Sequence, residues 1–117
     1  MNLVLLEGAL SSAPDVRTLA SGSVLAQLQV TTRDNGTTRT VPVAALDPPE
    51  WVCRLDAGAR LAVLGSVERR FFRAAGSTAS RTEVVATKLR RGTDRRACRR
   101  LRDDIVAGLG VADDVTD

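Results

Sequence analysis

The chain has 117 residues, a formal net charge of +3 and no histidine. This length suits one domain and is too short for a large enzyme cleft with its own lid. No run approaches the ~18 apolar residues of a membrane span, and the N-terminus lacks the basic-then-apolar pattern of a secretory signal. We therefore expect a cytoplasmic protein that has no membrane segment.

The basic charge is concentrated in one segment near the C-terminus. Residues 87–102 carry eight basic side chains and one acidic one, whereas residues 103–117 carry five acidic side chains and no basic one. Residues 1–86 are nearly balanced. Such asymmetry favours a segment that binds a polyanion beside an acidic end.

The residues on which most enzymes and metal sites depend are scarce. Cys53 and Cys98 are far apart and form no CxxC pattern, so we expect free thiols. The chain has no phosphate-binding GxxxxGK loop and no histidine base, and the acidic residues along the predicted strands are scattered singly, so they suggest no paired-carboxylate site. We expect no catalytic activity, no cofactor and no metal.

The first half of the chain predicts strands. Residues 2–10 form a first strand, which residues 16–19 continue after a turn. Apolar and polar residues alternate over 24–31, as in a half-buried strand. Asn35-Gly36 predicts a hairpin turn, after which residues 37–46 return as a third strand.

A short helix is expected next. Asp47 and Glu50 have the spacing of a capping box, and Gly58 ends the helix. Trp51 is expected to face inward as a plug under the strands, and base stacking is the alternative role for its ring.

The stretch from Leu61 to Arg73 combines an apolar strand, a glycine, positive charge and two aromatic rings. Gly65 predicts a bulge or sharp bend, and the basic end contains Arg69, Arg70, Phe71, Phe72 and Arg73. Rings stack on bases and guanidinium groups pair with phosphates, so this end is a candidate for binding single-stranded nucleic acid. The alternative is a core phenylalanine beside a solvated strand end.

Residues 81–89 complete five strands, with the short helix between the third and the fourth. This is the pattern of an all-β, five-stranded OB-fold barrel, which we place at residues 1–91. Residues 92–110 predict an amphipathic, arginine-rich C-terminal α-helix, and residues 111–117 an acidic disordered tail. The arginines over 90–102 have three alternatives: a solvated face, an arm that contacts DNA, or an intramolecular partner of the acidic end.

The chain resembles the bacterial single-stranded DNA-binding (SSB) family over about residues 1–90. The matching residues, in order, are Asn2, Val4, Leu6, Gly8, Leu10, Pro14, Val16, Arg17, Gly22, Ala26, Gly58, Val63, Gly65, Phe72, Thr82, Glu83, Val84 and Val85.

The resemblance implies an OB-fold homo-oligomer, a tetramer or dimer, that binds single-stranded DNA without sequence preference in replication, recombination or repair. The family's aromatic residue at the end of the fourth strand matches Phe72, and a basic position matches Arg70. Two other stacking positions fall on Thr38 and Ala44, which cannot stack on a base. The acidic end lacks the family's closing Pro-Phe, so partner recruitment by the family's route is not expected.

Missing stacking residues weaken the expected binding. Each base–aromatic stack contributes ~1–3 kcal/mol, so the loss of two costs roughly 2–6 kcal/mol. Arginines must then compensate, because guanidinium groups pair with phosphates and also stack on bases. The candidate DNA-binding residues are Phe72, Arg70, Arg69, Arg73, Arg33, Arg39 and Arg81. The alternative function is an OB-fold oligomerisation or adaptor protein with little affinity for DNA.

Overall fold

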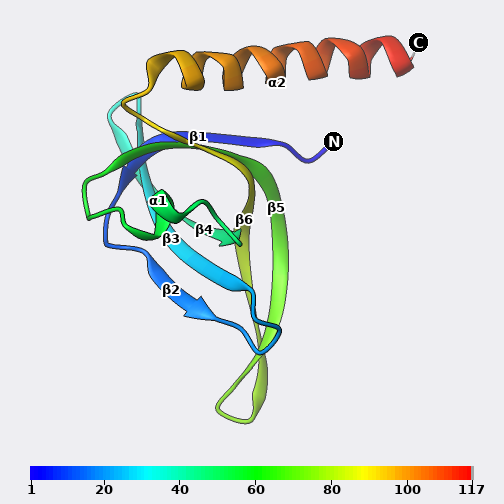
Figure 1. The fold of residues 1–117 in the computed structure, drawn as a ribbon. Coiled ribbons are helices and arrows are strands. Elements are labelled where there is room, and N and C mark those ends of the chain that lie inside the picture. Colours follow the sequence, from blue (N-terminus) through cyan, green and yellow to red (C-terminus); the bar gives the residue numbers. More distant parts are fainter. Residues whose placement is uncertain (117) are drawn as a thin grey trace.

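The computed structural model describes residues 1–116, with side chains described for residues 1–108. It contains six strands and two helices (Figure 1). In chain order these are β1 (Val4–Leu10), β2 (Asp15–Thr18), β3 (Val24–Asp34), β4 (Thr37–Leu46), α1 (Glu50–Cys53), β5 (Arg60–Ala74), β6 (Ser77–Arg91) and α2 (Arg95–Thr116).

Five of the strands close a barrel. They are hydrogen-bonded in the order β1-β5-β6-β4-β3, and β3 pairs again with β1 through Ala9 and Leu10. β4 and β6 run parallel, while the other neighbours run antiparallel. The short β2 follows β1 after a turn and pairs antiparallel with the first residues of β3, Val24 to Gln27. The predicted all-β OB-fold with five barrel strands is confirmed.

The barrel interior is built from aliphatic side chains. Ala26, Leu28 and Val30 point inward from β3, as their period of two predicts, and all three are fully buried. Val52 of α1 plugs one end, and Trp51 packs half-buried at the rim of the same end. Trp51 packs against the core as expected, but the fully buried plug is Val52.

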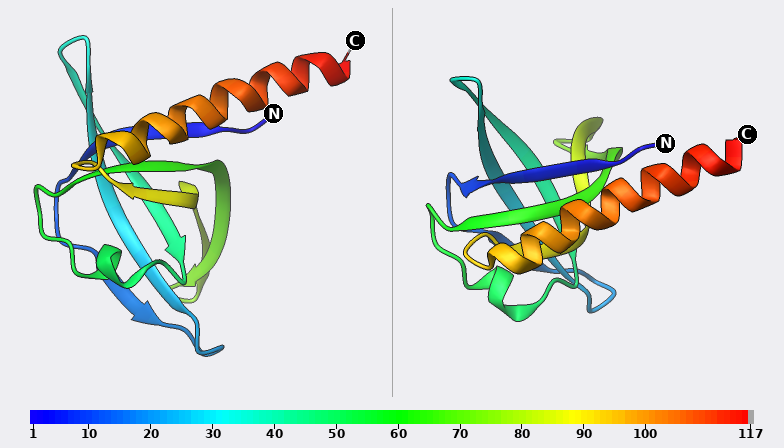
Figure 2. Two further views of the ribbon diagram at one scale, coloured as in Figure 1. Left: turned by 45° about the horizontal axis from the view of Figure 1, so that its top comes forward. Right: turned by 90° about the horizontal axis from the view of Figure 1, so that it is seen from above.

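The apolar run at the start of β5 is buried on both faces. Leu61 and Val63 point into the barrel, whereas Ala62 and Leu64 point outward and lie under α2. Cys98 and Leu101 of α2 cover them, so the first turns of the helix pack on this barrel's own outer surface. Figure 2 shows α2 lying along β1 and β5 and continuing beyond them.

The predicted break at Gly65 is confirmed. The β5–β6 register shifts between Leu64 and Gly65, and a Cβ atom at position 65 would collide with the carbonyl oxygen of Val85. A bulge at this point bends the strand, so that the first part of β5 belongs to the barrel and the second part forms a long hairpin with β6. β6 begins at Ser77 and not near residue 81, because the hairpin stays paired up to its turn.

The predicted capping box at α1 is wrong. Asp47 has a positive φ of 47°, and its carboxylate accepts a hydrogen bond from the backbone N–H of Val24, 2.9 Å away. Pro49 occupies the N-cap position without a side-chain cap. Asp47 therefore ties the end of β4 to the start of β3, a long-range contact that local spacing cannot reveal.

The helix α2 extends beyond Gly110, the residue where the sequence predicts its end. A glycine in a helix interior costs about 1 kcal/mol relative to alanine, which weakens a helix but does not forbid it. The side chains from residue 109 on lie outside the described part of the chain, and the disordered tail expected at residues 111–117 stays a prediction. Neither helix in the described part has the length and hydropathy of a membrane span.

Candidate nucleic-acid interface

A groove of about 460 Å³ separates β2 and β3 from the β5–β6 hairpin. The strand β5 continues past the barrel into this hairpin, which hangs below β2 in Figure 1. One wall of the groove is formed by Arg17, Leu19, Leu25 and Gln27, and the other by Arg70, Phe72, Arg73 and Arg81.

The register of the hairpin brings its groove residues together. Arg70 lies directly opposite Arg81, and Phe72 lies opposite Ala79. Alternate residues of a strand share a face, so these positions point to the same side of the hairpin. Because Ala79 has a small side chain, the residue opposite Phe72 on the neighbouring strand does not cover the ring.

The ring of Phe72 is flanked by two guanidinium groups. The Cζ atoms of Arg70 and Arg81 lie 6.0 Å and 5.9 Å from its centroid, within the range of cation–π attraction. The residue nevertheless keeps 37% of its surface exposed. A ring that has two guanidinium groups near it and is still open to solvent can accept a base as a third neighbour.

Arg70 is held by a buried carboxylate. Its Nε lies 2.9 Å from Oε1 of Glu83, which is only 4% exposed. The contact is an ion pair and not an aligned hydrogen bond, because this Nε has no partner with hydrogen-bond geometry. Burial of an unpaired carboxylate is costly, so Arg70 is needed to neutralise Glu83 as well as to flank the ring.

The other groove arginines are freer to bind a phosphate. Arg17 pairs with Asp15 at 3.1 Å, but both side chains are well exposed, and exposed pairs contribute little. Arg73 and Arg81 have no carboxylate within ion-pair distance among the side chains of residues 1–108. The groove therefore has an excess of positive charge.

The structure unites only part of the predicted site. Phe72, Arg70, Arg73 and Arg81 meet in the groove, whereas Arg69 is exposed and does not line it. Arg33 and Arg39 lie on the β3–β4 hairpin, whose tip is at the opposite end of the barrel from the β5–β6 tip (Figure 1). The seven predicted residues do not form one continuous surface.

Sequence reasoning missed the wall formed by β2 and β3. Arg17 faces the hairpin because Asp15–Thr18 pairs with Val24–Gln27 and curves with the barrel. The strand character of this segment was readable from the sequence, but its position across from Phe72 depends on barrel closure. Ala44 is 6% exposed, so that position offers no surface to a base.

The chain is similar to a crystal structure of wild-type single-stranded DNA binding protein from Thermus aquaticus, with a TM-score of 0.64 and 28% identity. The match covers 78% of this chain and 40% of the Thermus aquaticus chain, so this chain spans less than half of that protein's length. Neither a protein-family model nor a curated protein sequence matches this chain.

Proposed function

We propose that this protein binds single-stranded DNA without sequence preference, through the groove between β2, β3 and the β5–β6 hairpin. The observation that carries the proposal is the meeting of one partly exposed ring and four arginines in one groove. A ring that stacks on any base and cations that pair with any phosphate give affinity without reading the sequence. The similarity to the Thermus aquaticus protein supports the same conclusion.

The proposed roles of the groove residues differ. Phe72 stacks on a base, while Arg17, Arg73 and Arg81 pair with phosphates, and Arg70 holds the ring in place through its ion pair with Glu83. Arg69, Arg33 and Arg39 lie outside the groove. We propose that they contact only a strand that continues around the barrel.

The proposal includes the wider setting that the resemblance implies. The protein acts as a homo-oligomer without catalytic activity, in replication, recombination or repair of DNA in the cytoplasm. A groove with one stacking ring gives weaker binding than a surface with several, so more of the affinity must come from phosphate contacts.

A titration of labelled oligo-dT, followed by fluorescence anisotropy, tests the proposal. An oligonucleotide of about 30 residues is longer than the ~4–16 nucleotides that one OB-fold covers. With three or four phosphate contacts, the slope of log K against log salt concentration is expected to lie near −2 to −3. Absence of binding at about 50 mM salt would refute the proposal and favour the adaptor function.

A further inference from the structure

A cluster of exposed arginines lies on the other side of the barrel from the groove. We call it the α2 basic surface, and its members are Arg60, Arg95, Arg96, Arg99 and Arg100. None of the five has a carboxylate within ion-pair distance among the side chains of residues 1–108. Their charge is therefore available to a ligand.

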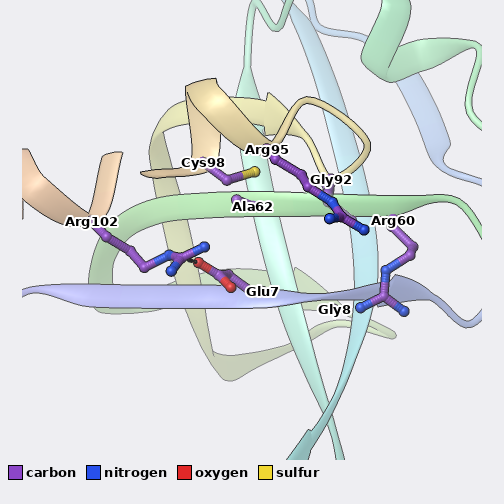
Figure 3. Close-up of a pocket in the computed structure, with 9 residues that line it drawn as sticks. Glu7, Gly8, Arg60, Ala62, Gly92, Arg95, Cys98 and Arg102 are labelled. Atoms are coloured by element: carbon purple, nitrogen blue, oxygen red, sulfur yellow. Dashed lines mark ion pairs between the residues drawn. The ribbon is translucent and has the colours of Figure 1, made fainter. Parts of the chain in front are cut away.

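A small cavity opens at the edge of this surface, between α2, β1 and β5. Its volume is about 80 Å³, enough for two or three water-sized groups and thus for the two non-bridging oxygens of one backbone phosphodiester. Figure 3 shows Arg95 extending past Gly92 toward Arg60, whereas Arg102 turns to Glu7 on β1. The Nε of Arg102 lies 2.8 Å from Oε1 of Glu7, so the one carboxylate that lines the cavity is already neutralised.

The residues around the cavity suit phosphate and do not suit bases. Arginine presents a planar fork of N–H donors that matches phosphate oxygens. No aromatic residue occurs on α2. The ring of Trp51 is half-buried and has the Arg91 guanidinium 4.8 Å from its centroid.

The extent of the surface is set by the sequence of α2. Arg95 and Arg99 are about one turn apart, as are Arg96 and Arg100, so each pair forms a row with a step of ~6 Å along the helix axis. Asp103 and Asp104 follow at once, and Asp104 lies 3.9 Å from Lys88. The cationic footprint is therefore limited to the first two turns of the helix.

We infer that the α2 basic surface is a second nucleic-acid site, which binds the phosphate backbone of a duplex. A duplex carries one negative charge per ~1.7 Å of its axis. Its bases are stacked inside, so a surface that has arginines and no aromatic ring can bind it through the phosphates alone. This site is separate from the groove and does not depend on the proposed single-strand binding. The chain is therefore expected to have two binding sites, one for single-stranded DNA and one for duplex, which can be measured separately with the two ligands.

Two variants with the same loss of charge provide the test. The helix variant carries Arg95→Gln, Arg99→Gln and Arg100→Gln, which keep a residue of good helix propensity. The groove variant carries Arg17→Gln, Arg73→Gln and Arg81→Gln. Each protein is titrated with a labelled blunt duplex of about 20 base pairs and with oligo-dT at several salt concentrations. Thermal unfolding confirms that the variants are folded.

The expected result is a reciprocal loss. The helix variant should bind the duplex at least tenfold more weakly, with a log–log salt slope shallower by about 2 to 3, and should keep its oligo-dT affinity within about threefold. The groove variant should show the opposite behaviour. Wild-type protein that binds oligo-dT but not the duplex, or a helix variant with unchanged duplex binding, would overturn the second site without affecting the first.

Two further outcomes also count against the inference. If both variants lose equal affinity for both ligands, the arginines act through the overall positive charge of the protein and not through a defined site. Polyglutamate and unlabelled duplex can each be used to displace the labelled duplex, with their concentrations expressed as negative charges. If polyglutamate displaces it at the lower concentration, the surface would be assigned to an acidic protein partner.

Discussion

At the scale of single residues, the two adjacent phenylalanines of β5 have different environments. Phe72 lines the groove and has two guanidinium groups near its ring, whereas Phe71 is 65% exposed and is not among the groove residues. Phe72→Ala should weaken oligo-dT binding about 5- to 150-fold, because a base–aromatic stack contributes ~1–3 kcal/mol. Phe71→Ala is the matched control and should change the affinity by less than about threefold. Equal effects in anisotropy titrations would contradict the assignment of Phe72.

Cys98 should make the stability of the protein fall at alkaline pH. Burial, and next the carboxylate of Glu7, raise the pKa of its thiol above the ordinary value of 9.0. The thiol also donates to the carbonyl oxygen of Arg91, 3.4 Å away, a contact that requires the proton. Above pH 9 the unfolded chain loses this proton while the folded chain keeps it, so the free energy of unfolding decreases as pH rises.

Urea unfolding between about pH 7.5 and 10 measures this decrease. Few other side chains can contribute in this range, since the chain has no tyrosine and a single lysine. Cys98→Ala should flatten the alkaline part of the profile. A Cys98→Ala profile parallel to that of the wild type would refute the explanation.

At the scale of elements, the packing of α2 on the barrel rests on few side chains. Leu101 is 2% exposed and contacts the cluster formed with Ala62 and Leu64, whereas Val106 is 68% exposed. Leu101→Ala should lower the free energy of unfolding by about 2–4 kcal/mol, and Val106→Ala by less than about 0.5 kcal/mol. Comparable urea midpoints for the two variants would show that α2 does not pack on β5 in solution.

The elements also show how far the sequence predicts this fold. Periodic strands, the Asn35-Gly36 turn and the bend at Gly65 follow from local rules, and all of them occur. Asp47 and Arg17 do not follow, because each acts through a partner distant in sequence, Val24 in one case and the far hairpin in the other. The alternation of residues shows which side chains share a face of a strand. Which other elements lie opposite that face depends on how the barrel closes, and local sequence does not reveal this.

At the scale of the whole molecule, the two cationic surfaces lie on opposite sides of one small barrel. In Figure 1, α2 lies above β1 and β5, while β2 and the β5–β6 hairpin, which form the groove, lie below. Their lining residues do not overlap, because the cavity beside α2 and the groove have no residue in common. If each surface binds as proposed, one chain can hold a single strand and a duplex at once.

Simultaneous binding is expected to be nearly independent, because no shared residue couples the two surfaces. Saturating unlabelled duplex should leave the affinity for labelled oligo-dT within about threefold, and donor-labelled oligo-dT with acceptor-labelled duplex should show energy transfer only when protein is present. The helix variant should abolish this transfer while it keeps oligo-dT bound. Competition between the ligands with no energy transfer would mean that both occupy the groove, and the arginines of α2 would then be a solvated helix face.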